Sequence, residues 1–187
     1  MSVLRIITGT ARGTRLETVP GDDLVRPTPE KVKEALFSAL QFDIEGRRVL
    51  DLFAGSGQLG LETLSRGAES ATLVDGADVS VTVIRRNVQK CGFEKEAKVL
   101  RSDYKVFLSS CREQFDIAFL DPPYGTGILQ KALPAVTQVM SEAGLIVCEH
   151  PLSEELPEVC EDFQTVKQYR YGKIGITLYR RQKEDDQ

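Results

Sequence analysis

Apolar and polar positions follow two alternating rhythms along most of the chain. Five short apolar runs have the pattern of strands buried on both faces: residues 49–53, 71–75, 97–100, 115–120 and 145–148. The segments between them carry apolar residues at helical spacing and are expected to end as helices near Arg66, Lys90, Ser110 and Met140. Another helix is predicted to follow Thr28 and Pro29, which suit an N-cap and a first turn. Strand and helix in alternation predict a doubly wound α/β sheet.

The two ends of the chain depart from this rhythm. Segments 165–171 and 174–181 flank Gly172 with no room for a helix, so we expect an antiparallel hairpin that closes the sheet. Short alternating stretches separated by glycines predict a hairpin-like arm over residues 1–25. The predicted organisation is this arm, one domain over residues 26–183 and an acidic tail over residues 184–187.

Composition narrows the class of protein. With 187 residues, 41% of them apolar and 28% charged, the chain has the make-up of one soluble folded domain. It has no run of about 18 apolar residues that could span a membrane, and residues 1–5 lack the core of a secretion signal. We therefore expect a cytoplasmic protein, and a monomer. No two cysteines form a C-x-x-C pair, so we expect reduced thiols and no metal site: Cys91, Cys111, Cys148 and Cys160.

The formal net charge of −4 argues mildly against nucleic-acid binding, but the distribution of charge argues for it. Residues 1–16 and 164–183 contain no acid. They carry nine basic side chains: Arg5, Arg12, Arg15, Lys167, Arg170, Lys173, Arg180, Arg181 and Lys183. Two basic strands that merely face solvent would give the same pattern, so charge alone leaves both interpretations open.

A glycine-rich turn follows the first apolar strand. Gly55 and Gly57 allow the backbone to turn tightly and a ligand to approach it, and open α/β sheets bind ligands at the carboxyl ends of such strands. Gly60 completes a G-x-G-x-x-G pattern, and Asp75 lies 20 residues after Gly55. A nicotinamide dinucleotide site has the same spacing, so spacing alone does not choose the cofactor.

Asp51 bears on that choice. A dinucleotide needs amide N–H groups for its pyrophosphate, whereas S-adenosylmethionine has no phosphate and carries a cationic sulfonium and an ammonium group. A carboxylate four residues before Gly55 suits those positive groups. Asp75 would accept from the ribose hydroxyls of either cofactor, and Asp103, at the end of the third strand, is placed to accept from an adenine amine. Acids at three successive strand ends favour S-adenosylmethionine.

The fourth strand ends in Asp121-Pro122-Pro123-Tyr124. Two prolines make a stiff backbone that can hold two acceptors in place, the Asp121 carboxylate and the Pro122 carbonyl. Two acceptors on an exocyclic amine would free its lone pair for attack on a methyl group, and the carboxylate would stabilise the developing positive charge. Tyr124 can stack on the base, which must be unpaired or flipped out. Asp and Pro also form ordinary turns. The four residues Asp121 to Tyr124, called the tetrad below, and the glycine turn together nevertheless favour methylation of a base amine.

Three rival functions remain to be weighed. A methyltransferase acting on adenine in DNA is permitted by the motifs, but the chain has no room for an added sequence-reading domain. A nicotinamide oxidoreductase would explain the glycine turn and leave Asp121 to Tyr124 unexplained. A catalytically inactive cofactor-binding module is disfavoured by the intact tetrad. His150, the sole histidine, is expected to form local hydrogen bonds at the end of the fifth strand and is given no catalytic role.

Further segments recur in a known order over residues 4–181: Arg5-Ile6-Ile7-Thr8-Gly9, Arg12-Gly13, Arg26-Pro27-Thr28, Glu34-Ala35-Leu36-Phe37, Asp51 to Gly57, Leu64-Ser65-Arg66-Gly67-Ala68 and Tyr171-Gly172-Lys173. With the tetrad, which is typical of amino-methyltransferases, they resemble the RsmD family of bacterial 16S rRNA guanine-N2 methyltransferases. Ser38 stands where that family usually has Asn, and Gly76 where a polar residue is expected after the acid. Both departures concern contacts with the cofactor.

The resemblance implies a Rossmann-like, seven-stranded mixed sheet, S-adenosylmethionine as cofactor, and a guanine of 16S rRNA in the small ribosomal subunit as substrate. Adenine N6 remains the alternative target, since the choice of guanine rests on the resemblance alone. Segment 26–28 would cap the cofactor pocket. The implied cofactor-binding residues are Asp51, Phe53, Ala54, Gly55, Ser56, Gly57, Asp75, Gly76, Ser102, Asp103 and Tyr104. The implied catalytic residues are Asp121, Pro122, Pro123 and Tyr124, and the implied RNA contacts are Arg5, Arg12, Arg15, Arg26 and Lys173.

Overall fold

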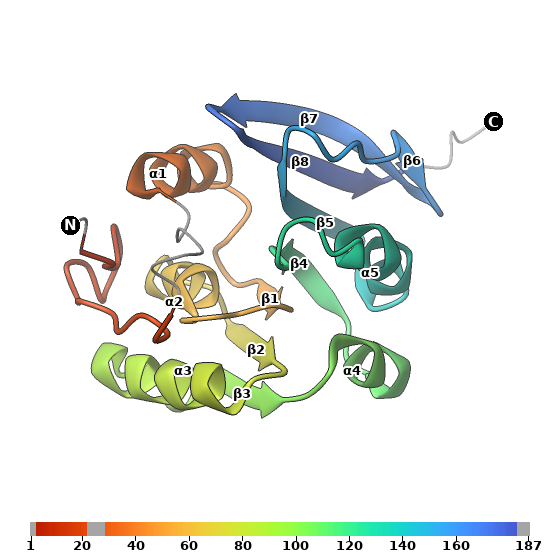
Figure 1. The fold of residues 1–187 in the computed structure, drawn as a ribbon. Coiled ribbons are helices and arrows are strands. Elements are labelled where there is room, and N and C mark those ends of the chain that lie inside the picture. The colour runs from red at the N-terminus through yellow and green to blue at the C-terminus, as the bar shows by residue number, and fades with distance from the viewer. Residues whose placement is uncertain (1–2, 22–28, 183–187) are drawn as a thin grey trace.

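An eight-stranded sheet runs through the middle of the molecule, with helices on both faces (Figure 1). The computed structural model describes residues 3–21 and 29–182. Within these ranges the helices are α1 (Glu30–Ala39), α2 (Gln58–Ser65), α3 (Asp78–Cys91), α4 (Tyr104–Ser110) and α5 (Ile128–Thr137). The strands are β1 (Arg48–Asp51), β2 (Ser70–Asp75), β3 (Ala97–Arg101), β4 (Phe115–Leu120), β5 (Met140–Pro151), β6 (Val159–Cys160), β7 (Phe163–Tyr171) and β8 (Ile174–Arg181).

The strand order is β3-β2-β1-β4-β5-β8-β7-β6. The first five strands in this order are parallel, and β8 pairs antiparallel with both β5 and β7. The predicted α/β sheet with a closing hairpin is therefore confirmed. The predicted number of seven strands is wrong, because β6 adds an eighth, of two residues, beside β7. Two residues are too few to show the alternation that reveals a strand in a sequence.

Element boundaries differ most around residue 140. The helix predicted to reach Met140 ends at Thr137, and β5 begins at Met140 instead of Leu145. Met140 pairs with Phe115 at the start of β4, and β8 pairs with β5 from Leu145 to Pro151. Pairing with both neighbours extends the strand well beyond its apolar centre. Among the described helices, none has the length and apolar character needed to cross a membrane.

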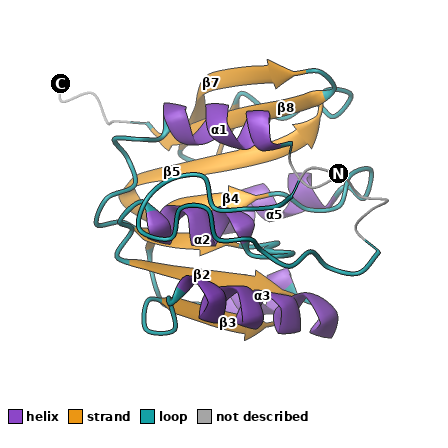
Figure 2. Ribbon diagram, turned by 90° about the vertical axis from the view of Figure 1, so that its left-hand side faces the viewer, coloured by secondary structure: helices purple, strands orange, loops and turns teal. Residues whose placement is uncertain are grey.

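Each face of the sheet has its own apolar core. The first cluster lies under α1, α2 and α3 and includes Leu36, Phe37, Leu61, Ile84, Ile117 and Phe119. The second cluster lies under α4 and α5 and includes Leu50, Phe107, Leu120, Leu133, Val136 and Cys148. Figure 2 shows α1, α2 and α3 together on the near side of the sheet. Because side chains alternate along each strand, neighbouring strand residues contribute to opposite clusters.

The N-terminal segment, residues 3–21, packs against this domain as a hairpin-like loop. Arg5 and Arg15 form an isolated antiparallel bridge. A Cβ added to Gly9 would lie 1.7 Å from the carbonyl oxygen of Ser65, so the two backbones approach too closely for any side chain. Three of its residues are buried in the first cluster: Ile6, Ala11 and Leu16. The division of the chain into arm, domain and tail stays a prediction, and residues 184–187 lie outside the described ranges.

Glu62 on α2 holds the N-terminal segment, α1 and α2 together. Its side chain is fully buried and accepts hydrogen bonds from the backbone N–H groups of Ile7 at 2.8 Å and Thr8 at 3.0 Å. The ammonium of Lys33 lies 3.4 Å from one carboxylate oxygen, and Arg66 Nε lies 3.0 Å from the other. Buried ions are costly unless they are paired and hydrogen-bonded. These four partners together therefore make the burial of Glu62 tolerable.

We predict that Glu62→Ala lowers the free energy of unfolding by about 3 kcal/mol or more, because Lys33 keeps only the carbonyl of Arg5 and loses its anionic partner, and the two N–H groups lose their acceptor, in a dry environment. Urea unfolding would measure this. The matched control is Glu30→Ala, which removes the more exposed pair with Arg5 and should cost under about 1 kcal/mol. Equal losses in the two variants would show that Glu62 is not the tie between these elements.

Candidate active site

The glycines that follow β1 serve two purposes, a tight turn and close packing of a helix. Gly55 and Gly57 have φ angles of +56° and +80°, which favour glycine. A Cβ on Gly55 would meet nothing within 4 Å, so the backbone there borders open space. On Gly60, by contrast, a Cβ would lie 2.5 Å from the side chain of Leu73. Gly60 is therefore needed for close packing of α2 on β2, and the backbone at Gly55 is left accessible to a ligand.

Asp51, at the end of β1, lies beneath the turn. It is 2% exposed, and its Oδ2 accepts a hydrogen bond from the Gly60 N–H at 3.0 Å. Burial raises the pKa of Asp51 to about 7; the Gly60 hydrogen bond opposes this rise and the charge of Asp75 adds to it. The sequence placed Asp51 against the positive groups of a cofactor. In the structure its hydrogen bond is to the first turn of α2, and contact with a cofactor stays a prediction.

The other two strand-end acids also bond to backbone. Asp75 accepts from the N–H groups of Gly55 and Ala77, both at 2.9 Å, and so ties the end of β2 to the glycine turn. Asp103 caps α4, with its Oδ1 accepting from Lys105 N at 2.8 Å. Each carboxylate has about four acceptor sites, so these bonds leave capacity for the ribose and adenine contacts that the sequence predicted.

Asn87 on α3 supports the turn from behind, and sequence reasoning missed it. Its side chain is 0% exposed and donates to the carbonyl oxygens of Ser56 and Glu17, both at 2.9 Å. Its Oδ1 also accepts from Glu17 N at 2.7 Å. One amide thus joins the glycine turn to the N-terminal segment. A single asparagine within an amphipathic helix carries no signal of this role in the sequence.

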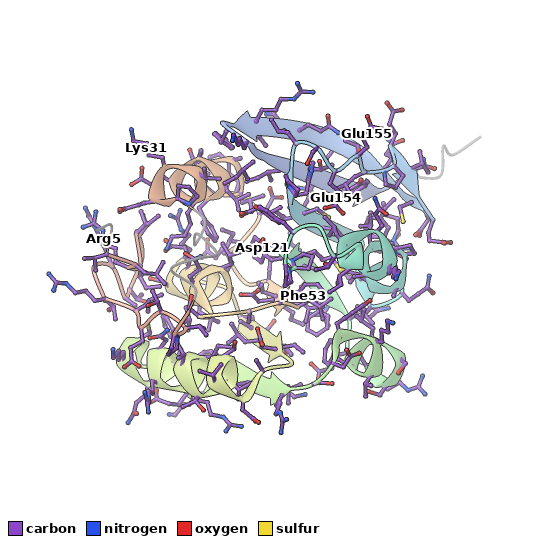
Figure 3. All side chains as sticks on the ribbon, viewed as in Figure 1. Arg5, Lys31, Phe53, Asp121, Glu154 and Glu155 are labelled. Atoms are coloured by element: carbon purple, nitrogen blue, oxygen red, sulfur yellow. The ribbon has the colours of Figure 1, made fainter. Side chains whose placement is uncertain are left out.

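An aromatic pair flanks the strand ends on the side of α4. The rings of Phe53 and Tyr104 lie 5.4 Å apart at 53°. Figure 3 shows Phe53 and Asp121 together near the centre of the molecule, whereas Arg5 and Lys31 lie at its periphery. Beside this pair, Gly76 is exposed and Ser102 is partly exposed. The carboxylates accept hydrogen bonds, the glycine turn leaves space at Gly55, and the aromatic rings can stack. Together these groups fit a cationic ligand that carries a ribose and an adenine.

The tetrad follows β4 directly. Pro122 is buried, Pro123 is exposed, and the carbonyl of Pro123 accepts from Thr126 Oγ1 at 2.7 Å. Tyr124 is 45% exposed, so one part of its ring is available for stacking. Its hydroxyl donates to Glu149 Oε1 at 2.9 Å. Burial, followed by the charges of Glu149 and Asp121, raises the pKa of the Tyr124 hydroxyl, which therefore stays a donor.

Three carboxylates, those of Asp51, Asp121 and Glu149, share one face of the sheet at the ends of β1, β4 and β5. The residue before each belongs to the second cluster: Leu50, Leu120 and Cys148. Because successive side chains of a strand point to opposite faces, the three carboxylates point toward the face of α1, α2 and α3. Burial raises the pKa of Asp121 well above its ordinary value, and the charges of Glu149 and then Asp51 raise it further. This edge therefore favours a ligand that brings positive charge or N–H donors.

Glu149 was not among the residues predicted from the sequence. It is 6% exposed, at the end of β5, and lies beside the tetrad through its hydrogen bond with Tyr124. The sequence offered one signal, an acid that directly follows the apolar run Leu145 to Cys148 and precedes His150. His150 itself bonds to Pro151 O and Thr177 Oγ1, which confirms the expected local role. All four cysteines are free thiols.

The predicted RNA contacts lie at two places. Arg5, Arg12 and Arg15 are exposed on the N-terminal segment, and Arg5 pairs with Glu30 at 2.8 Å. Lys173 is exposed in the turn between β7 and β8. Since Ile174 pairs with Pro151, that turn lies at the same edge of the sheet as Glu149. Arg26, like the rest of segment 26–28, lies outside the described residues.

The fold and the strand-edge site define an α/β protein of the methyltransferase class. Among solved structures, a putative methyltransferase, yhhF of Escherichia coli, has a TM-score of 0.84 and 31% identity, covering 98% of this chain and 100% of that one. A family model described as "Conserved hypothetical protein 95" matches residues 4–180. The chain belongs to this family.

Two relatives match along almost their whole length. The putative rRNA methyltransferase YlbH of Bacillus subtilis is 37% identical over 183 residues, which cover 95% of this chain and 99% of that protein. The ribosomal RNA small subunit methyltransferase D of Escherichia coli is 34% identical over 187 residues, or 98% and 92% of the two chains. These relatives confirm the family predicted from the sequence.

We predict that Asp51→Asn changes how stability depends on pH. Because the folded-state pKa of Asp51 is raised from 3.8 to about 7, the folded protein binds a proton that the unfolded chain loses between these values. The contribution of Asp51 to the free energy of unfolding therefore falls as pH rises from about 4 to 7. The asparagine variant should gain stability relative to the wild type across that window and then level off. Urea unfolding at several pH values measures the difference, and a difference independent of pH would contradict the raised pKa.

Proposed function

We propose that this protein transfers a methyl group from S-adenosylmethionine to the exocyclic N2 amine of a guanine in 16S rRNA of the small ribosomal subunit. The observation that carries the proposal is the placement of Asp121 to Tyr124 on the same sheet edge as the open glycine turn. Family membership supports it, because relatives spanning nearly the whole chain bear the names of rRNA methyltransferases. The protein methylates rRNA, and guanine N2 is the finer part of the proposal.

The cofactor end of the site would lie over the glycine turn. The residues that would hold the cofactor lie at or directly after the ends of β1, β2 and β3: Asp51, Phe53, Ala54, Gly55, Ser56, Gly57, Asp75, Gly76, Ser102, Asp103 and Tyr104. When bound, S-adenosylmethionine supplies an electrophilic methyl group on a sulfonium cation. The carboxylate of Asp51, which is 2% exposed, favours that positive charge, since it is held in a dry environment. Asp75 would accept from the ribose hydroxyls and Asp103 from the adenine amine.

The base end of the site would lie over the tetrad. The Asp121 carboxylate and the Pro122 carbonyl accept the two N–H groups of the amine and orient its lone pair toward the methyl group. Tyr124 stacks on the base, and its hydroxyl is fixed by Glu149. Such positioning is the main requirement for in-line transfer. As the nitrogen becomes positively charged, the nearby Asp121 carboxylate stabilises it and can accept the proton that the nitrogen releases.

The RNA would approach across the carboxyl edge of the sheet. Lys173 is best placed to contact a phosphate near the flipped base, because its turn lies beside the end of β5. Arg12 and Arg15 would contact RNA farther from the site, on the N-terminal segment. A flipped guanine needs such backbone contacts, since they hold the surrounding RNA while the base leaves its stack.

Tritium transfer tests the proposed function. Purified protein is incubated with labelled S-adenosylmethionine and small-subunit particles that lack their guanine-N2 methylation, with free rRNA and DNA in parallel. We expect label in the 16S rRNA and N2-methylguanine after digestion. Label in adenine would move the proposal to the alternative base, and no transfer to any RNA would refute it.

The tetrad makes a separate prediction. Asp121→Ala keeps the Pro-Pro backbone but removes one acceptor, so single-turnover rates should fall by about 10²-fold or more while cofactor binding measured by calorimetry survives. If hydrogen-bond geometry dominates, Asp121→Asn, which keeps an acceptor oxygen, should retain much more activity than alanine. If the negative charge dominates, asparagine should be nearly as poor as alanine and, because the pKa of Asp121 is raised, the wild-type rate should fall as pH is lowered. Full activity of Asp121→Ala would show that transfer is not organised here.

A further inference from the structure

Glu149 lies where it could contact a bound base at the ring position next to the amine held by Asp121. β4 and β5 are parallel, with Leu120 paired to Cys148 on strands about 4.8 Å apart, so Asp121, the first residue after β4, and Glu149 follow side by side on neighbouring segments. Both side chains point to the face of α1, α2 and α3, as argued above. Tyr124, which would stack on the base, donates its hydroxyl hydrogen to Glu149 Oε1 at 2.9 Å. A base beneath that ring, with its amine at Asp121, would bring its neighbouring ring position to Glu149.

The chemistry at that ring position differs among the bases. Guanine carries an N1–H donor next to its N2 amine. Adenine has an unprotonated N1 next to its N6 amine, and cytosine has an unprotonated N3 next to its N4 amine. A carboxylate accepts hydrogen bonds and donates none. It therefore pairs with the guanine edge and opposes the lone pair of the other two.

We propose that Glu149 selects guanine by accepting its N1–H while Asp121 and the Pro122 carbonyl hold the N2 amine. The inference rests on the proposed function, and it gives a physical reason for guanine that the sequence did not supply. Holding Tyr124 does not prevent this role, because a carboxylate offers about four acceptor sites. Glu149 is thus a specificity residue that also positions the stacking ring.

Burial makes the selection strong. Glu149 is only 6% exposed, so water cannot easily replace a missing N–H partner. A site built around such a hydrogen bond rejects analogues without the donor by large factors, because a bare ring nitrogen turns its lone pair toward the carboxylate in a poorly hydrated place. The charge of Glu149 also raises the pKa of Asp121. The strand register places the two carboxylates on neighbouring segments, within reach of adjacent atoms of one base.

One modified base isolates this contact. 2-Aminopurine keeps the C2 amine of guanine but has a bare N1 and no O6. The guanine that the wild type methylates is located first, and particles are then reconstituted with 16S rRNA carrying 2-aminopurine at that single position. The wild type should prefer guanine by about 10²-fold or more in kcat/KM. A wild-type ratio near one would overturn the inference without any variant.

Glu149→Gln is the discriminating variant. It keeps the size of the side chain and an acceptor for Tyr124, and it gains an amide N–H that can donate to a bare N1. The guanine-to-2-aminopurine ratio should fall about 10-fold or more, with S-adenosylhomocysteine affinity by calorimetry unchanged. The matched control is Glu155→Gln, an exposed acid on the loop after β5, which Figure 3 places away from Asp121; it should keep the wild-type ratio.

Tyr124→Phe separates selection from positioning. It removes the hydrogen bond to Glu149 and leaves the carboxylate, so the ratio should stay close to that of the wild type even if the rate falls. A ratio lost in Tyr124→Phe and kept in Glu149→Gln would overturn the inference in favour of positioning alone. If guanine is methylated with the same ratio in wild type and Glu149→Gln, the inference fails and the proposed function stands. If the wild type methylates no guanine, both fail.

Discussion

Parallel pairing of β1, β4 and β5 is the constraint on which the site depends. It brings three strand ends to one edge, and the alternation of side chains then places Asp51, Asp121 and Glu149 on one face. Burial in a poorly hydrated place raises the pKa of both Asp51 and Asp121; the charge of Asp75 adds to the first shift, and the charges of Glu149 and then Asp51 add to the second. The fold thus gathers acceptor groups at this edge, where a cationic or N–H-rich ligand can bind them.

Buried carboxylates at the sheet edge lower the free energy of unfolding, and the apolar cores and the Glu62 contacts offset this loss. Glu62 contrasts with Asp51, although both are buried acids. Glu62 has two cations and two backbone donors around it, whereas Asp51 has one backbone donor and acidic neighbours. The first arrangement is what a structural ion pair requires, and the second is what a ligand site requires. Distinguishing the two needs the partners of each carboxylate as well as its burial.

Sequence patterns predicted most of the architecture because apolar periodicity and glycine turns are local properties. The parallel strands, the helices between them and the hairpin around Gly172 all followed from such local signals. The start of β5 at Met140 and the two-residue β6 did not, because strand pairing with distant segments decides them. In the site, the tetrad and the three strand-end acids could be recognised from type and spacing. Glu149 and Asn87 could not, since their roles arise from contacts with residues 25 to 70 positions away.

The position of β8 has a consequence for how the molecule is assembled. This strand lies between β5 and β7, so until residues 174–181 have been synthesised, β5 remains an unpaired edge of the sheet. β5 is a strand of buried apolar residues that also carries Glu149, and open edges of this kind pair readily with other chains. A nascent chain released before β8 is made would therefore leave the edge of β5 unprotected. It would also lack the strand that pairs with β5 beside Glu149. Synthesis of one late strand both completes the sheet beside the site and covers an edge that is open to pairing with other chains.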